Sequence, residues 1–311
     1  MLITFVSMLC SSILTICITC LATFAVTLIF KTSTTTNFAQ GSIATLGCYL
    51  TAHFFGKMGV PVWIGLFPGI VVGIICGLFV DVVIFRNGRN VTAVGKQIIT
   101  MGIVSIIFGG IPLIFGNPES IPFEPFYNAV AAGESPNLFI PFGTGSIVIT
   151  KHSLICLGIT VVILGVLFCL LKFSKWGLAV RTTASSELTA GLMGINTRVI
   201  TAASWAIAGA IGVVAAVMFA GGGAKIGVSF MTTIQVNAFL AGILGGFSTF
   251  YGPLVGAICI QVASVFFGFI ASLPGMSGLT RWNMVIVYVL MLVVILIRPQ
   301  GILGKRIVKK V

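Results

Sequence analysis

Residues 172–198 read Lys-Phe-Ser-Lys-Trp-Gly-Leu-Ala-Val-Arg-Thr-Thr-Ala-Ser-Ser-Glu-Leu-Thr-Ala-Gly-Leu-Met-Gly-Ile-Asn-Thr-Arg, and the rest of the sequence is organised around this polar stretch. The segments on either side of it are long apolar runs. The stretch carries four basic residues, Lys172, Lys175, Arg181 and Arg198. Because basic residues concentrate in the cytoplasmic loops of membrane proteins, the stretch is predicted to lie in the cytoplasm.

A short helix is predicted inside this stretch. Ser185 and Ser186 are residues of the type that caps a helix N-terminus. They are followed at helical spacing by Glu187, Ala190 and Met193–Gly194. Such a helix on the cytoplasmic face would be a natural docking element for a soluble partner. The pattern also fits a plain connecting loop with a solvated charged face.

The composition excludes an ordinary soluble protein. Of 311 residues, 58% are hydrophobic and only 7% are charged, whereas soluble domains contain about 25% charged residues. The formal net charge of +12 does not indicate nucleic-acid binding, because most Lys and Arg residues stand at the ends of apolar runs. The sequence is therefore that of a polytopic membrane protein.

The eight cysteines are interpreted as small buried apolar side chains rather than as disulfide partners or metal ligands. All of them fall inside apolar runs: Cys10, Cys17, Cys20, Cys48, Cys76, Cys156, Cys169 and Cys259.

The predicted fold is an all-α, polytopic membrane helical bundle with about eight or nine transmembrane helices, some of them broken or re-entrant, in one domain over residues 1–311. The predicted membrane segments are residues 6–30, 41–55, 62–85, 97–115, 153–171, 200–220, 233–244, 254–273 and 282–297. Residues 116–150 contain five prolines and three of the five acids, so they are predicted to form an external loop. An odd number of crossings places the N-terminus outside and the C-terminus in the cytoplasm.

No catalytic constellation is evident, and no cofactor or metal is expected. The Gly-Lys pairs at residues 95–96 and 304–305 lack the Ser or Thr that completes a phosphate-binding loop. Asp81 is interpreted as the partner of Arg86 in an interfacial ion pair. The chain is therefore not expected to be an enzyme. Transport through it would be driven by a partner ATPase or would be passive conduction.

Two uncharged interruptions of apolar runs are candidates for a translocation pathway. They are residues 37–41 and residues 245–253. Their glycines fit close helix packing equally well. Asn37 and Gln40 are predicted to be functional, because a buried amide needs partners.

Five motifs in register resemble those of the branched-chain amino acid ABC permease family, in its LivH-like subunit. They are Asn37-Phe38-Ala39-Gln40-Gly41 with Leu46 to Tyr49; Thr100-Met101-Gly102; Arg181 to Gly194-Ile195-Asn196; Leu244 to Thr249 with Gly252 to Gly256; and Arg298 to Gly304.

The resemblance implies the permease subunit of a bacterial inner-membrane importer. ABC ATPase subunits, a second, non-identical permease and an extracytoplasmic substrate-binding protein would be its partners, and membrane lipid would surround it. The residues implied in ATPase coupling are Arg181, Ser186, Glu187, Ala190, Met193, Gly194 and Ile195. Those implied in the pathway are Asn37, Phe38, Gln40, Gly41, Gly245, Gly246 and Ser248. Permeases for urea, amides, sugars or nucleosides remain alternatives, as does an ATP-independent carrier or channel.

Overall fold

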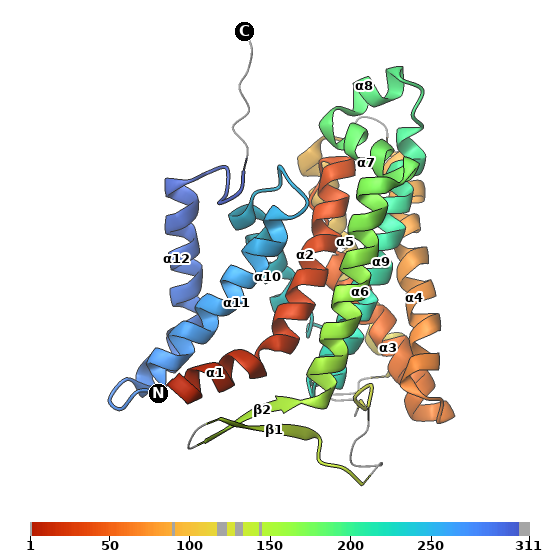
Figure 1. Cartoon of the computed structure of the whole chain (residues 1–311). Coiled ribbons are helices and arrows are strands. Elements are labelled where there is room, and N and C mark those ends of the chain that lie inside the picture. The colour runs from red at the N-terminus through yellow and green to blue at the C-terminus, as the bar shows by residue number, and fades with distance from the viewer. Residues whose placement is uncertain (1, 89–90, 117–122, 128–132, 143–144, 305–311) are drawn as a thin grey trace.

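The structure is a computed structural model that describes residues 2–88, 91–116, 123–127, 133–142 and 145–304 (Figure 1). Its elements are α1 (Leu2–Ser11), α2 (Ile13–Ser33), α3 (Gln40–Met58), α4 (Val62–Leu78), the π-helix η1 (Phe79–Phe85), α5 (Ala93–Phe115), β1 (Asn137–Phe142), β2 (Gly145–Thr150), α6 (Lys151–Phe173), α7 (Lys175–Ser185), α8 (Glu187–Leu192), α9 (Thr197–Gly221), α10 (Thr232–Gly245), α11 (Gly252–Ala271), the 3₁₀-helix η2 (Ser277–Trp282) and α12 (Asn283–Ile297).

The described residues contain 7 helical stretches that are long and apolar enough to cross a membrane. These stretches are Ile13–Ser33, Val62–Phe85, Ala93–Phe115, Lys151–Phe173, Thr197–Gly221, Gly252–Ala271 and Gly278–Ile297. Helix α3, with 19 residues, and the shorter apolar α10, with 14, also lie in the bundle. The predicted polytopic helical fold is confirmed, and its eight or nine membrane helices agree with this arrangement.

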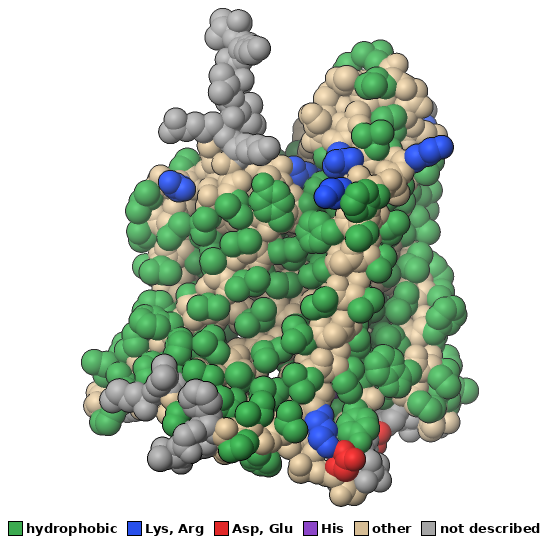
Figure 2. All heavy atoms as spheres, in the orientation of Figure 1, with side chains coloured by type: hydrophobic (Ala, Val, Ile, Leu, Met, Phe, Trp, Pro, Cys, Tyr) green, Lys and Arg blue, Asp and Glu red, His purple; other side chains and the backbone are tan. Residues whose placement is uncertain are grey.

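The two ends of the bundle differ in what they carry. Helices α7 and α8 lie at one end, here called the α8 end, together with the end of α12 (Figure 1). Helix α1 and the β1–β2 hairpin lie at the opposite end, here called the hairpin end. Figure 2 shows a broad band of hydrophobic side chains between them, with Lys and Arg gathered mainly towards the α8 end and acidic side chains visible at the hairpin end.

Helices α2 and α9 form the interior of the bundle. Most of α2 and α9 is buried, whereas little of α5 and α12 is buried inside the bundle. Threonine hydroxyls of α2 bond back to the preceding turn, as Thr23 does to Thr19 O and Thr27 to Thr23 O. These bonds satisfy polar atoms inside α2, which allows a helix with so many threonines to be buried.

Helix α4 packs closely because one face of it carries no side chains. Its glycines at residues 65, 69, 73 and 77 are buried and repeat every fourth residue. A Cβ atom on Gly73 would lie 2.7 Å from Gly209 O of α9, and one on Gly77 would lie 2.3 Å from Trp205 O. Small residues at this spacing let helix backbones approach each other in a membrane.

The N-terminal membrane segment is shorter than predicted. The sequence suggested one helix over residues 6–30, but the helix ends at Ser11 and α2 starts at Ile13. The hydroxyls of Ser11 and Ser12 both donate to Met8 O at 2.8 Å, and the Ser12 N–H is shared between Met8 O and Leu9 O. These competing bonds interrupt the regular helix, because serine side chains offer the backbone alternative partners.

The predicted external loop contains an antiparallel hairpin, with Asn137 opposite Thr150, that the sequence analysis did not identify. His152, in the first turn of α6 directly after this hairpin, is buried. Its Nδ1 accepts the Phe126 N–H at 3.3 Å, so its Nε2 donates to Met218 O at 3.0 Å. His152 thus anchors the loop to α9.

Two of the eight cysteines also differ from the prediction. Cys169 and Cys259 are exposed on the outer surfaces of α6 and α11, where lipid would surround them.

Candidate translocation site and coupling face

Helix α3 begins inside the bundle rather than at its end. Helix α2 stops where Thr34 adopts the left-handed conformation (φ 50°), and α3 does not start until Gln40. The Gln40 Nε2 donates to Ala208 O at 2.7 Å. At 1.5 Å per residue, Ala208 lies about 16 Å from the start of α9, near the middle of that helix. The start of α3 therefore lies at about mid-depth.

Asn37 organises the residues that precede α3. Its Oδ1 accepts the Ala39 N–H at 2.9 Å, and its Nδ2 donates to Gln40 Oε1 at 3.2 Å. Asn37 is fully buried (0% exposed) and Gln40 is nearly so. The prediction that these amides need partners fits the structure, where the two side chains bond to each other, to the backbone and to α9.

Helix α10 also begins at this depth. Gln235, in the first turn of α10, donates from Nε2 to Asn37 O at 3.1 Å. A Cβ atom on Gly41 would lie 3.2 Å from Gln235 Cβ, so the two helix starts touch. The chain reaches α3 from the α8 end, through residues 34–39, and α10 from the hairpin end, through residues 222–231. The two helices thus enter the same region from opposite ends.

Side chains of α5 and α10 enclose the helix starts. Thr100 Oγ1 of α5 accepts the Phe38 N–H at 3.2 Å, and the Phe38 ring lies 5.0 Å from the ring of Phe239 on α10. Among the described atoms, the buried Thr36 Oγ1 has no hydrogen-bond partner. The break between α2 and α3, residues 34–39, therefore contains both a polar atom with unused hydrogen-bonding capacity and an aromatic side chain, Phe38.

The second predicted pathway segment lies elsewhere. Gly245 and Gly246 end α10 at the α8 end, about 15 Å along that helix from Gln235 at 1.5 Å per residue. A Cβ atom on Gly245 would lie 1.9 Å from Gly252 O, and Gly246 has a φ of 88°. The structure therefore does not bring Gly245, Gly246 and Ser248 together with Asn37, and it gives the two glycines a clear packing role.

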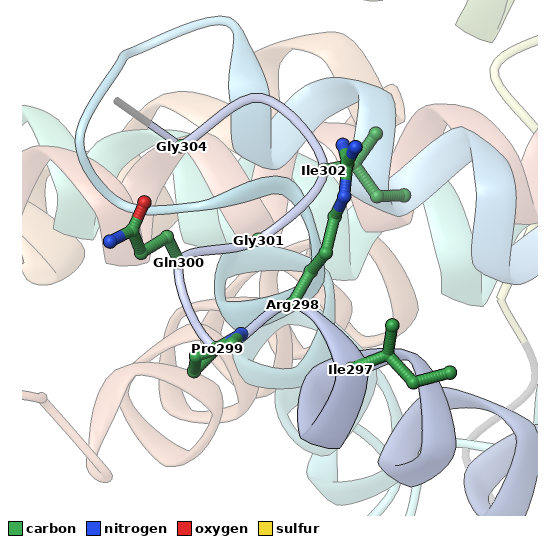
Figure 3. A pocket seen from close by; sticks show the side chains of 7 residues that line it. All are labelled: Ile297, Arg298, Pro299, Gln300, Gly301, Ile302 and Gly304. Atoms are coloured by element: carbon green, nitrogen blue, oxygen red, sulfur yellow. The ribbon is translucent and has the colours of Figure 1, made fainter. Parts of the chain in front are cut away.

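The chain after α12 folds back onto this second segment. Ile302 N–H donates to Leu244 O at 2.7 Å, and Leu303 N–H donates to Gly245 O at 3.2 Å. Figure 3 shows this return as a loop whose Arg298 and Gln300 side chains point away from each other. A cavity of about 430 Å³ is lined by this loop itself, at the α8 end.

The predicted short helix is present as α8. Ser186 is its N-cap, accepting the Thr189 N–H at 3.2 Å, as the sequence indicated. Ala190 is buried against the bundle. Gly194 has a φ of 80°, which lets the Ile195 N–H return to Ala190 O at 3.0 Å. Arg181 belongs to α7, where its guanidinium lies against Gly177 O.

The outer face of α8 is apolar and exposed. Leu188 is 76% exposed, Leu192 is 81% exposed and Met193 is 71% exposed. Met193 was among the residues predicted for ATPase coupling, whereas the two leucines were not, although their spacing of four residues places them on one helix face. Adjacent exposed apolar side chains at the end of a bundle are typical of a protein contact surface.

A small polar cavity of about 130 Å³ lies between α8, η1 and the end of α2. The predicted ion pair is confirmed here, with Arg86 Nη2 3.2 Å from Asp81 Oδ2 and 2.8 Å from Arg198 O. Glu187 of α8 and Ser33 of α2 also line the cavity. The first residue of α8 thus lies close to the point where the chain leaves α2 for the mid-depth break.

Comparisons with known proteins agree with the motif resemblance. A family profile described as "Branched-chain amino acid transport system / permease component" matches residues 8–295. The chain is 25% identical over 291 residues to the "High-affinity branched-chain amino acid transport system permease protein LivH" of Escherichia coli (strain K12), covering 88% of this chain and 87% of that protein. It is 28% identical over 292 residues to the "Probable branched-chain amino acid transport permease protein LivH" of Methanocaldococcus jannaschii, covering 91% and 88%.

A third relative is the "High-affinity branched-chain amino acid transport system permease protein BraD" of Pseudomonas aeruginosa, 27% identical over 288 residues and covering 88% of each chain. No solved structure matches the chain significantly. The family match runs from α1 into α12 and includes both helix starts and α8. This integral membrane protein is therefore a transport component that belongs to the branched-chain amino acid transport system permease family.

Proposed function

We propose that this chain, as one permease domain over residues 1–311, is the membrane-spanning subunit of an ATP-binding-cassette importer for branched-chain or related amino acids. The observation that carries the proposal is the contact between the starts of α3 and α10, made by Gln235 and Asn37. Broken helices at membrane depth persist where they are buried in protein or line a substrate route. The route is assigned to Asn37, Phe38, Gln40 and Gly41, with Gly245, Gly246 and Ser248 bordering it at the α8 end.

Separate ATPase subunits would supply the energy by docking on the α8 end. The exposed side chains of Leu188, Leu192 and Met193 offer them an apolar contact surface. Closure of the ATPases would move α8, and the polar cavity with Glu187 would transmit this movement to the end of α2. Arg181, Ser186, Ala190, Gly194 and Ile195 would hold α7 and α8 in the shape that the contact requires.

The proposed orientation rests on the positions of the basic residues. Lys172 lies at the end of α6 and Lys175 and Arg181 lie in α7, at the α8 end (Figure 1), so this end is assigned to the cytoplasm of a bacterial cell. The N-terminal helix and the hairpin then face outwards, where an extracytoplasmic binding protein would deliver the substrate. A second, non-identical permease subunit would complete the pathway, as the family resemblance implies.

The first test is affinity purification of the chain from its native membrane in mild detergent, with identification of every co-purifying protein. We expect ATPase chains and a second permease. Proteoliposomes containing the purified complex and its binding protein should then accumulate leucine only when ATP is supplied. A chain that purifies without any ATPase and equilibrates leucine without nucleotide would contradict the proposal and favour a passive carrier or channel.

A further inference from the structure

A basic cavity lies beside α7, and Ser248, which borders the proposed route, is one of its lining residues. It has a volume of about 750 Å³, and its walls come from α2, α6, α7 and the loop between α10 and α11. Lys31, Lys172 and Arg181 supply its charges, and no acidic residue is among the described residues that line it. Three cations from three helices therefore surround one space.

The neighbours of these cations do not neutralise them. Lys31 Nζ donates to Ser248 O at 2.5 Å and lies 5.5 Å from the centre of the Phe250 ring. Arg181 lies against backbone carbonyl oxygens, and Lys172 lies over the ring of Phe173. The two ion pairs in the described part of the chain involve other residues. The cavity consequently retains a positive potential.

The position and floor of the cavity indicate a lipid. Lys31 and Lys172 stand in the last turns of α2 and α6, where membrane helices reach the phosphate level of the bilayer. Below the cations, Phe168 and Leu171 make the cavity wall apolar. A cationic rim above an apolar floor matches a phosphorylated headgroup joined to the first carbons of acyl chains, and basic pockets between helices bind anionic lipids.

We propose that this cavity binds the phosphate-bearing headgroup of an anionic phospholipid. In the orientation of the proposed function, the lipid comes from the cytoplasmic leaflet. A bound headgroup would contact cations of α2, α6 and α7 at once, beside the loop that follows α10. It would hold α7, which precedes the ATPase contact surface, against the end of α2.

The test measures lipid binding by the purified full chain and does not depend on transport. Native mass spectrometry would quantify the retention of phosphatidylglycerol and phosphatidylcholine by the wild type and by a Lys31→Gln/Lys172→Gln variant. With about 1 kcal/mol per cation near the lipid surface, two lost charges should weaken phosphatidylglycerol binding about 30-fold. Phosphatidylcholine retention should not change.

Matched variants separate a specific site from general surface charge. Lys175→Gln/Lys225→Gln removes two exposed charges outside the cavity and should retain phosphatidylglycerol as the wild type does. Lys31→Arg/Lys172→Arg should also bind it. If the double Gln variant does not fold, Lys172→Gln alone should weaken binding about fivefold.

Three results would overturn the proposal. The first is equal retention of phosphatidylglycerol by the wild type and the folded Lys31→Gln/Lys172→Gln variant. The second is displacement of the lipid by millimolar inorganic phosphate or glycerol phosphate, which would indicate a site for a free anion. The third is a Lys31→Gln/Lys172→Gln variant that retains the lipid but no longer co-purifies with the ATPase, which would assign the cations to a protein partner. Failure of transport itself would leave the binding result unaffected.

Discussion

At the residue scale, Asn37 joins the starts of α3 and α10. Asn37 caps the start of α3 with its side chain and accepts a bond from α10 with its backbone oxygen. Its side chain is therefore responsible for the shape of the break, while its carbonyl joins the break to α10. Substitution of the side chain tests the first of these roles separately.

Asn37→Leu should reduce ATP-dependent leucine uptake by about tenfold or more. The substitution strands the Ala39 N–H and Gln40 Oε1 inside the protein, and each stranded buried group costs about 1–3 kcal/mol. Uptake into proteoliposomes and size-exclusion chromatography would separate a transport defect from a loss of assembly. The control is Asn237→Leu, another buried amide, which bonds to Tyr288 outside the break. Equal uptake by the two variants would show that Asn37 has only a packing role.

Glu187→Lys should weaken ATPase docking without unfolding the bundle. Glu187 stands in the first turn of α8, where a negative charge is favourable, and it shares a cavity with Arg86, Lys96 and Arg198. A lysine there adds a cation to a cluster of cations. The measurement is the affinity of the reconstituted chain for its ATPase, with Glu187→Gln expected to give an intermediate value. Unchanged uptake by Glu187→Lys would remove this role.

At the element scale, α8 is a helix of 6 residues that depends on its caps and on the buried Ala190 for its structure. Leu188→Asp/Leu192→Asp should abolish ATPase co-purification while leaving the melting temperature of the isolated chain unchanged, because both side chains are exposed. Leu138→Asp, an exposed leucine of the hairpin, is the control and should retain the ATPase. Retention of the ATPase by the α8 variant would place the docking surface elsewhere.

The glycine face of α4 gives a second prediction at this scale. Gly73→Leu should destabilise the bundle severely, because its Cβ atom would lie 2.7 Å from a backbone oxygen that cannot move aside. Gly109→Leu on α5 should have little effect, since nothing lies within 4 Å of a Cβ atom at that position. Thermal unfolding in detergent, monitored by monodispersity, would compare the two. Similar behaviour of both variants would contradict the packing of α4 against α9.

At the scale of the whole molecule, the arrangement of its two ends can be tested by labelling. Ser135→Cys, near the hairpin, should react with a membrane-impermeant maleimide in intact cells. Thr189→Cys, on α8, should react only after the inner membrane is permeabilised. Maleimide labelling of the wild type, through its own cysteines, gives the background signal. The reverse pattern would invert the assigned orientation and, with it, the leaflet of the proposed lipid.

Features that depend on local sequence were predictable. The length of the apolar runs identifies the membrane helices. The Ser186 side chain caps α8 by accepting the N–H of Thr189, which is only three residues away. The meeting of α3 and α10 was not predictable in this way, since Gln235 and Asn37 are 198 positions apart. The sequence also could not show that the two glycine-containing interruptions, residues 37–41 and 245–253, lie apart, because their separation results from the packing of α3 and α10.

The spacing of the α4 glycines has a consequence for motion. Gly73 and Gly77 meet the backbone of α9 at Gly209 and Trp205, and the Val213 side chain of α9 lies against Gly73. A translation of one repeat, about 6 Å at 1.5 Å per residue, would bring another glycine opposite Gly209 and restore the same close approach. A shear step of α4 along α9 would therefore keep a backbone contact between the two helices, but it would require the Val213 side chain to move from its place against Gly73.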